Sequence, residues 1–563
     1  MIAGPPIPLA ALGPEILLLV GGCIVLLLGQ STRDARRRLA PWCTLSVLVL
    51  GLVLVLGLPR WTADAAGNGL AYGSLAMFVR LSALELGILL TLVNWTGARE
   101  AERGEFLALM LFSLTGLLLV GPADNLLMLF LALELVSVPT YIMVVLSRTR
   151  AGALEAGTKY FYLGAVSAAL MAYGFSFLYG VSGTASLSGT INAVADALRQ
   201  PGTLAGGLAT VGVVLALVGL LFKIAAVPMH FYIADVYQGA ASPVAGLLGF
   251  VPKLAGLVAI IKILALTGEW STSGTPVFWL LWIVAAVSMT VGNVLALRQT
   301  NIKRLLGYSG IAHAGYMLVG VLAGPLAGDT GYGTMGDGTA AALYYVVVYG
   351  VANLGAFAVL AVLRVRGAAC ETLRDVAGVV RRHPGLALLL VLALFTLMGL
   401  PPTPGFWGKL SLFGSALAAA RATAIPAHDA WLIALVVIAV LNSALAAAYY
   451  LRVIAAVLLY ENEQPAHAVS GEAQHIGALL CGFLLLIFAL YPSGLLSAGL
   501  NATRELTHAV AASPATSADA WDATLVAPLM DASTALAERQ KKYADIGSSR
   551  SGLPQSIRPA SSR

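Results

Sequence analysis

Two lysines lie inside long apolar stretches near the middle of the chain. Lys223 lies in LVGLLFKIAAVPMHFY, and Lys253 lies in LLGFVPKLAGLVAI. A charge at the centre of a lipid bilayer costs about 2.5–3.5 kcal/mol on insertion scales, so charges placed there usually mark ion or proton paths. Apolar-rich sequence flanks each lysine on both sides, so neither can reach an interface by extending its stem. We therefore expect both lysines to carry protons or ions.

Three further ionisable residues lie in apolar surroundings: Glu134 in LLMLFLALELVSVPTY, Lys409 in GLPPTPGFWGKLSLF and His313 in KRLLGYSGIAHAGYM. A buried carboxylate tends to take up a proton and a buried lysine tends to lose one, unless each has a partner. Glu134 and Lys223 could form such a pair, which would titrate jointly. For His313, a structural hydrogen-bonding role and a proton-relay role both remain open.

Several other polar residues are weaker candidates. Arg80 and Glu85 are five residues apart, so they do not share a helix face, and Glu85 is expected to be structural or to contact a neighbouring subunit. Glu15 is expected at the membrane interface. Lys262, near the end of its apolar stretch, is expected to extend to the interface. A stripe of tyrosines is interpreted as packing: Tyr344, Tyr345 and Tyr349.

Composition excludes a soluble protein. The 563 residues are 59% hydrophobic and 11% charged, with a mean hydropathy of +0.87, whereas soluble domains carry about 25% charged residues. The net charge of +6 comes with arginines in short loops, so no nucleic-acid partner is expected. The four cysteines are scattered without a C-x-x-C pair, and no nucleotide-binding glycine motif is found. We expect no cofactor, metal or disulfide in this chain.

The apolar stretches predict an all-α polytopic membrane protein, because a spanning helix needs about 20 apolar residues. About fourteen spans are expected: 12–29, 41–58, 75–95, 105–121, 124–146, 159–181, 206–237, 243–264, 276–297, 305–323, 341–364, 385–424, 430–452 and 476–499. Two spans are overlong and interrupted, one at Pro228 and one at the PPTPG of residues 401–405. Such interruptions in two separate parts of a chain indicate discontinuous helices in inverted repeats. A short helix is expected within NAVADALRQ of the polar outer loop 182–205.

Loop charges predict the orientation. Most basic loop residues follow odd-numbered helices: Arg33, Arg36, Arg37, Arg38, Arg148, Arg150, Arg298, Lys303, Arg304, Arg366, Arg374, Arg381 and Arg382. Odd helices should therefore end in the cytoplasm, which leaves both termini periplasmic. The loop 453–475 disagrees, because it holds three glutamates and no lysine or arginine. The first apolar stretch is read as a retained helix. Beyond residue 500 we expect a polar tail, partly helical over 515–541 and disordered at its end.

Four stretches resemble the antiporter-like proton-pumping subunits of respiratory complex I, and specifically its N branch, the counterpart of mitochondrial subunit 2. They are GEFLALMLFSLTGLLLVGPADNLLMLFLALELVSVPTYIMV, LFKIAAVPMHFYIADVYQGAASPVAGLLGFVPKLAGL, ALRQTNIKRLLGYSGIAHAGYMLVG and GLPPTPGFWGKLSLF. Leu133 replaces the tryptophan typical of the L and M branches, and Lys409 ends GFWGK as in the N branch. The long tail and Glu85 depart from the family pattern.

The resemblance implies helices 1–3 over 1–104, two inverted five-helix repeats over 105–264 and 276–455, helix 14 over 476–499 and a tail over 500–563. It implies proton translocation in the bacterial inner membrane, coupled to quinone reduction in other subunits of NADH-quinone oxidoreductase. NADH, FMN, iron–sulfur clusters and quinone would then belong to partner subunits, and an M-type and a small K-type subunit would be the neighbours. It also implies a relay through five residues: Glu134, Lys223, Lys253, His313 and Lys409.

Two alternatives share the same core: a subunit of a multisubunit cation/proton antiporter, and the membrane anchor of a hydrogenase-like complex. The GFWGK and LALELVSVP signatures favour the N branch, and neighbouring genes for quinone-site and iron–sulfur subunits would decide. In all three cases the helix breaks should leave unpaired backbone groups that only polar side chains or water can satisfy. We therefore expect the five relay residues to form one polar line parallel to the membrane plane, with neighbours one or two waters apart and an exit near Lys409.

Overall fold

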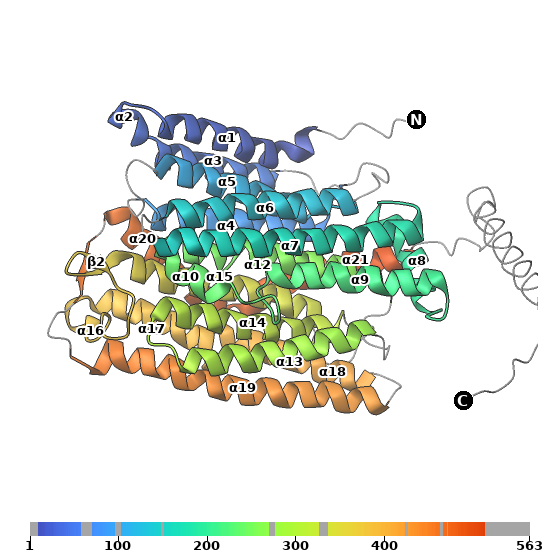
Figure 1. Cartoon of the computed structure of the whole chain (residues 1–563). Helices are drawn as coiled ribbons and strands as arrows, with labels where there is room; N and C mark the ends of the chain where they lie inside the picture. Colours follow the sequence, from blue (N-terminus) through green and yellow to red (C-terminus); the bar gives the residue numbers. More distant parts are fainter. Residues whose placement is uncertain are drawn as a thin grey trace, which may run out of the picture. The chain divides into compact units, whose positions relative to one another are not determined.

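The computed structural model describes residues 9–57, 70–95, 103–147, 151–268, 276–325, 336–422, 426–461, 466–469 and 471–512. These residues belong to one compact unit of packed helices, Met1–Ala512 (Figure 1). The helix expected within 515–541 and the expected disordered end lie outside the described residues.

The helices before the first break are η1 (Leu9–Leu12), α1 (Gly13–Gly29), α2 (Asp34–Arg37), α3 (Ala40–Gly57), α4 (Ser74–Val93), α5 (Arg103–Val120), α6 (Leu126–Leu146), α7 (Ala151–Ser182), α8 (Leu187–Leu198) and α9 (Leu204–Lys223). After it come α10 (Ile233–Gly239), α11 (Ser242–Leu248), α12 (Val251–Ala265), α13 (Pro276–Leu297), α14 (Ile302–Ala323), α15 (Gly338–Val362), α16 (Val379–Arg382), α17 (Pro384–Met398), α18 (Pro404–Ala422), α19 (Pro426–Leu459), α20 (Glu472–Leu490) and α21 (Pro492–Ala512). The short helix expected near residue 192 is confirmed as α8.

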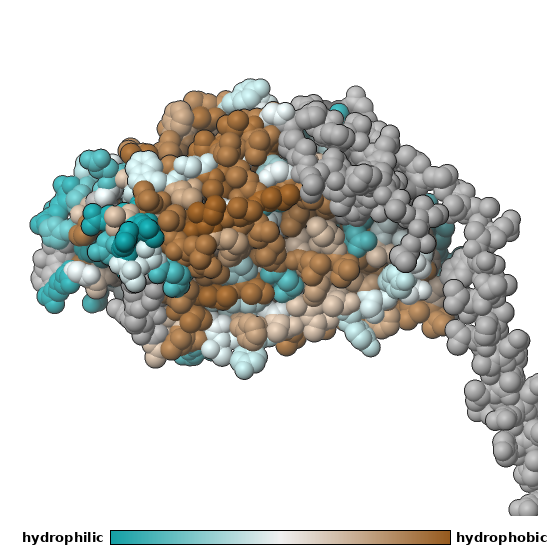
Figure 2. Space-filling model, turned by 90° about the horizontal axis from the view of Figure 1, so that it is seen from above, coloured by the Kyte–Doolittle hydropathy of each residue, from teal (hydrophilic) through white to brown (hydrophobic). Residues whose placement is uncertain are grey.

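The prediction of a helical membrane protein is confirmed. Among the described residues, twelve helices are long and apolar enough to cross a membrane, and α1 and α17 are shorter apolar helices. In Figure 2 hydrophobic surface covers the middle of the helices, while hydrophilic residues gather at the end where Figure 1 shows α2, α16 and β2. Helices that are apolar on all sides lie in the interior. Accordingly α15 and the α11–α12 segment are buried along their whole length.

Local sequence explains many helix boundaries. The side chain of Asn125 accepts hydrogen bonds from the amides of Leu127 and Met128 at the start of α6, and Asn301 does the same for Arg304 at the start of α14. These side chains satisfy amides that have no partner within the helix. Correct boundaries matter here because they set which turn of each helix holds an ionisable residue.

The last predicted span was wrong in its extent. Residues 476–499 do not form one helix, because α20 ends at Leu490 and α21 begins at Pro492. Proline has no amide hydrogen to continue α20, but it is well suited to the first turn of a new helix. Since α21 reaches Ala512, the predicted start of a polar tail at residue 500 falls inside a helix.

A small antiparallel sheet joins two loops at one end of the bundle. Strand β1 (Leu363–Val365) pairs with β2 (Ala368–Ala369) on one side and with β3 (His467–Ala468) on the other. The guanidinium of Arg381 also lies 2.5 Å from a carboxylate oxygen of Glu461. Glu461 and β3, which belong to the connection between α19 and α20, therefore lie beside Arg381 and β1, on the same side of the bundle, as the predicted helix order requires.

Both predicted helix breaks are confirmed. Helix α9 ends at Lys223, and an irregular segment containing Pro228 leads to α10 at Ile233. Helix α17 ends at Met398, and residues 399–403 lead to α18. Gly399, the residue after α17, has a φ of +82°, a left-handed conformation that glycine adopts without strain. Each break exposes the last carbonyl groups of a helix inside the protein.

Candidate functional site

Glu134 and Lys223 form the predicted ion pair. Lys223 is the last residue of α9, and its Nζ lies 2.9 Å from Oε1 of Glu134 on α6. The ammonium group also donates a hydrogen bond of 2.6 Å to the hydroxyl of Ser137, one turn after Glu134. The side chain of Lys223 is 2% exposed, whereas that of Glu134 is 22% exposed. The carboxylate is therefore the more exposed member of the pair.

Lys253 is bound by backbone carbonyls rather than by a carboxylate. It lies in the first turn of α12, and its Nζ donates to the carbonyl of Ile224 at 2.7 Å and to that of Gly310 at 3.0 Å. Ile224 directly follows Lys223, so the first break supplies the acceptor. Gly256 allows this packing, because a Cβ there would lie 2.7 Å from Cβ of Lys223.

His313 is held between two tyrosines. Its Nδ1 lies 2.8 Å from the hydroxyl of Tyr345, and its Nε2 lies 3.0 Å from the hydroxyl of Tyr450. The hydroxyl of Tyr450 is also hydrogen-bonded to Ser309. The ring of Tyr349 lies 4.8 Å from the imidazole and 5.8 Å from the Lys253 ammonium. Of the tyrosine stripe, Tyr345 therefore hydrogen-bonds the imidazole, whereas Tyr349 contacts His313 and Lys253 through its ring.

Lys409 repeats the arrangement at the second break. It lies in the second turn of α18, and its Nζ donates a 2.8 Å hydrogen bond to the carbonyl of Met398, the last residue of α17. A cation beside the C-terminus of a helix is stabilised by the unpaired carbonyls there. The ring of Tyr316 lies 4.8 Å from the ammonium. Gly399 allows this approach, because a Cβ there would lie 2.8 Å from Cδ of Lys409.

These contacts link the five predicted residues in one order across the bundle. Glu134 contacts Lys223, the next residue after Lys223 accepts from Lys253, and the ring of Tyr349 lies between Lys253 and His313. His313 is 5.9 Å from the ring of Tyr316, which lies under Lys409. Figure 1 shows the helices concerned following one another from α6 through α12 and α14 to α18. Tyrosine rings and peptide carbonyls lie between neighbouring members of this order.

The prediction for Lys262 was wrong. Its side chain does not extend to the surface but is buried, and its Nζ donates to the carbonyls of Gly121 and Ala123 at 2.6 and 2.5 Å. Both acceptors lie between α5 and α6. Lys262 therefore links α12 to the connection between α5 and α6 by hydrogen bonds. The hydropathy pattern of α12 cannot indicate this contact, because the acceptors lie in a distant part of the chain.

The prediction for Glu15 was also wrong. Glu15 is buried rather than interfacial, and its Oε1 lies 2.7 Å from the guanidinium of Arg80 on α4. Arg80 also donates to the carbonyl of Ala11 at 2.9 Å. The partner of Arg80 therefore lies on another helix, 65 residues away in the sequence. This pair joins α1 to α4.

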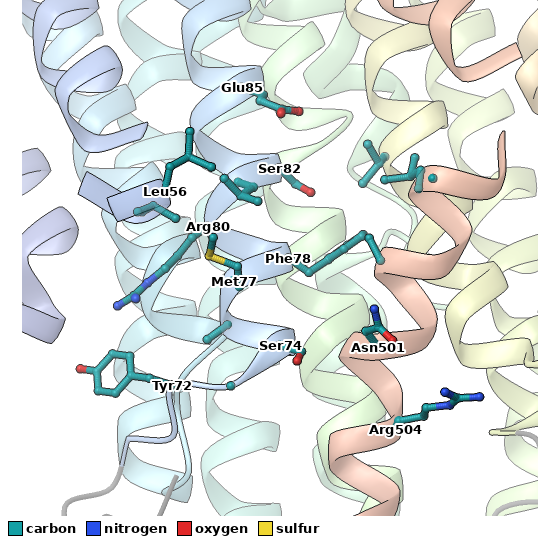
Figure 3. Close-up of a pocket in the computed structure, with 18 of the residues that line it drawn as sticks. Leu56, Tyr72, Ser74, Met77, Phe78, Arg80, Ser82, Glu85, Asn501 and Arg504 are labelled. Carbon is teal, nitrogen blue, oxygen red and sulfur yellow. The ribbon is translucent and has the colours of Figure 1, made fainter. Parts of the chain in front are cut away.

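Glu85 faces a groove with a volume of about 870 Å³, between α4 and the α20–α21 segment (Figure 3). Its side chain is exposed, and Ser82 and Asn501 line the same groove among mostly apolar residues. None of the five predicted relay residues lines it. The predicted relay and Glu85 therefore occupy different parts of the protein.

Sequence reasoning missed another buried lysine. Lys303, counted above as a loop charge, is fully buried, and its Nζ donates to the carbonyls of Gln238 and Ala240 at 3.0 and 2.7 Å. Its position in the first turn of α14, two residues after the capping Asn301, is the sequence signal for it. Among the described residues, no group of three or more His, Cys, Asp or Glu is placed to hold a metal ion.

Comparison with known proteins gives a consistent result. Residues 123–432 match the family described as NADH:quinone oxidoreductase/Mrp antiporter, TM. NADH-quinone oxidoreductase subunit N of Trichlorobacter lovleyi is 36% identical over 451 residues, which cover 78% of this chain and 85% of that protein. A chain of respiratory complex I from Thermus thermophilus with bound aureothin is 31% identical, with a TM-score of 0.69 over 86% of this chain and 98% of that one.

A chain from a different membrane complex shares this fold. A chain of the Mrp complex from Dietzia sp. aligns with a TM-score of 0.73 over 90% of this chain and 100% of that one, but at only 19% identity. At that identity the match shows a shared fold and nothing about shared chemistry.

Proposed function

Since this chain belongs to the membrane family shared by NADH:quinone oxidoreductase and Mrp antiporters, we propose that it is the proton-translocating N subunit of an NADH-quinone oxidoreductase. Fold similarity alone does not separate this function from that of an antiporter, because the Mrp chain aligns as well as the complex I chain. Sequence identity supports the choice, since it is 31% to the Thermus thermophilus complex I chain and 19% to the Mrp chain.

The observation that carries the proposal is the order of hydrogen bonds and ring contacts that leads from Glu134 to Lys409. A proton enters at Glu134, the more exposed member of the ion pair. Protonation neutralises the carboxylate, which weakens its electrostatic attraction for the ammonium of Lys223. Because the two groups interact strongly, they exchange protons as a pair rather than separately. A proton released by Lys223 then moves toward Lys253, whose ammonium is bound by the carbonyl of the adjacent Ile224.

The backbone carbonyls that accept hydrogen bonds from Lys253 and Lys409 can keep these bonds whether the lysine is charged or neutral. A protonated lysine has three N–H donors, and a neutral amine keeps two, so Lys253 can lose a proton and still donate to both of its carbonyl acceptors. Lys409 has the same freedom toward Met398. His313, with a tyrosine hydroxyl at each ring nitrogen, can take up a proton on one nitrogen and release one from the other.

The remaining features of the proposal concern the assembly. The chain crosses the bacterial inner membrane fourteen times with both termini periplasmic, and the segments 105–264 and 276–455 are inverted repeats. In support, each contains three continuous helices, a broken fourth and a fifth: α5, α6, α7, α9–α10 and α11–α12 in the first, and α13, α14, α15, α17–α18 and α19 in the second. The chain acts as a translocase component without a redox centre. Partner subunits bind NADH, FMN, iron–sulfur clusters and quinone, and an M-type and a small K-type subunit are its neighbours.

The test is proton uptake by inverted membrane vesicles that contain the assembled complex, driven by NADH and followed with a pH-sensitive dye. Lys223→Ala and Lys253→Ala should each strongly reduce uptake in complexes that still assemble. The matched control is Lys159→Ala, because Lys159 forms exposed ion pairs and lies outside the order of contacts. Wild-type uptake in both central variants would exclude the proposed relay. Copurification of this chain without quinone-site or iron–sulfur subunits would exclude the proposed complex.

A further inference from the structure

Lys409 differs from Lys223 in what stabilises its charge. Among the described residues no carboxylate forms an ion pair with Lys409, although its side chain is buried. Its ammonium has the carbonyl of Met398 at 2.8 Å and the ring of Tyr316 at 4.8 Å from the ring centre. A cation within about 6 Å of the face of an aromatic ring is attracted by its electron density, most strongly where water is excluded. The ring of Tyr316 therefore has the same role toward Lys409 that the carboxylate of Glu134 has toward Lys223: it stabilises the ammonium charge.

The ring of Tyr316 is held in place by a buried polar cluster that contains no charged group. The amide of Asn293 on α13 donates to the Tyr316 hydroxyl at 3.3 Å and to the backbone carbonyl of Asn442 on α19 at 3.0 Å. The hydroxyl of Tyr449 donates to the Asn293 side-chain carbonyl at 3.0 Å. Asn293, Tyr316 and Tyr449 are all essentially inaccessible. Interhelical hydrogen bonds of this kind fix side chains within membrane bundles.

We propose that Tyr316 is a further functional residue of the relay, whose ring stabilises the protonated form of Lys409, and that Asn293 is a positioning residue that holds this ring. The inference rests on the proposed function and deepens it. At Lys223 a carboxylate balances the charge of the ammonium, whereas at Lys409 an aromatic ring stabilises it. A ring attracts the ammonium but cannot accept its proton, so Tyr316 stabilises protonated Lys409 without competing for its proton.

Substitutions at position 316 separate the ring from the hydroxyl. In the assembled complex, Tyr316→Phe keeps the ring and should retain NADH-driven proton uptake within about twofold of wild type, whereas Tyr316→Leu should lower it about 2- to 30-fold. Asn293→Leu should lower uptake by no more than about as much as Tyr316→Phe does, because each variant removes the hydrogen bond at the tip of the ring and leaves the ring in place. The matched control is Tyr344→Leu. Tyr344 is a buried tyrosine of the same region, and its hydroxyl donates to the carbonyl of Pro404.

A fluorinated phenylalanine at position 316 distinguishes the loss of cation–π attraction from a loss of side-chain packing. It has nearly the shape of phenylalanine, but fluorine withdraws electron density from the ring face and weakens its attraction for a cation. Uptake lower than with phenylalanine, at equal assembly, supports the proposal even if Tyr316→Leu fails to assemble. Equal uptake by the fluorinated and unfluorinated rings overturns it.

The variant Lys409→Gln separates this inference from the proposed function. Loss of uptake in Lys409→Gln, with no effect of fluorination, would overturn only the role of Tyr316. Wild-type uptake in Lys409→Gln would remove Lys409 from the relay, and the role of Tyr316 would be excluded with it.

Discussion

The ion pair between Glu134 and Lys223 permits a quantitative test in the assembled complex. Glu134→Gln would leave the ammonium of Lys223 without a counter-charge in a site where its side chain is 2% exposed, with only neutral acceptors, the Ser137 hydroxyl and the new amide carbonyl, beside it. Removing one member of a buried ion pair costs about 3–5 kcal/mol. Because Glu134 is 22% exposed, we expect the lower end of this range, about 3 kcal/mol. Lys223→Met should cost less, since the carboxylate left behind is partly solvated.

The two changes should not be additive. In the double variant Glu134→Gln/Lys223→Met no unpaired charge remains, so it should be more stable than Glu134→Gln alone, despite carrying one more substitution. The measurement is the half-life of the assembled complex on native gels after heating in detergent. A cost of about 3 kcal/mol corresponds to a half-life shortened by up to about 100-fold if all of it acts on the unfolding barrier. A double variant less stable than both single variants would refute the reasoning, because it would show that the pair contributes no mutual stabilisation.

Three further predictions follow from the geometry. Gly399→Ala should reduce proton uptake without removing any charge, because a left-handed residue with a Cβ is strained by about 1–2 kcal/mol and the methyl group would displace Lys409; unchanged uptake and unchanged stability would contradict this. Lys262→Met should lower the amount of assembled complex, since two buried carbonyls lose their donor at about 1–3 kcal/mol each, but uptake per assembled complex should stay normal; the opposite pattern on native gels would count Lys262 among the relay residues. In a background without the native cysteines, Ser188→Cys should react with a membrane-impermeant thiol reagent in intact cells and Thr372→Cys should not, and reversed labelling would invert the proposed orientation.

Hydropathy and backbone chemistry made much of this protein predictable from the sequence. Long apolar stretches must be helical in lipid, because only a helix or a closed barrel satisfies every backbone group there. The breaks at Pro228 and at the PPTPG of residues 401–405 were recognisable because proline and glycine act through the local backbone. The ionisable residues of the candidate site were recognisable for a similar reason, since a charge inside an apolar stretch stands out without any knowledge of its partners.

The partners themselves were decided only by tertiary structure. Arg80 pairs with Glu15 across 65 residues, and Lys262 donates to carbonyls 139 and 141 residues away. Lys253 and Lys409 are also bound by carbonyls, and a carbonyl group is present in every residue, so the sequence cannot mark which one serves as a ligand. Tyrosines gave no signal either, because the same residue type fills a core or contacts a cation. Whether a ring packs against aliphatic groups or lies under an ammonium depends on how helices from distant parts of the chain meet.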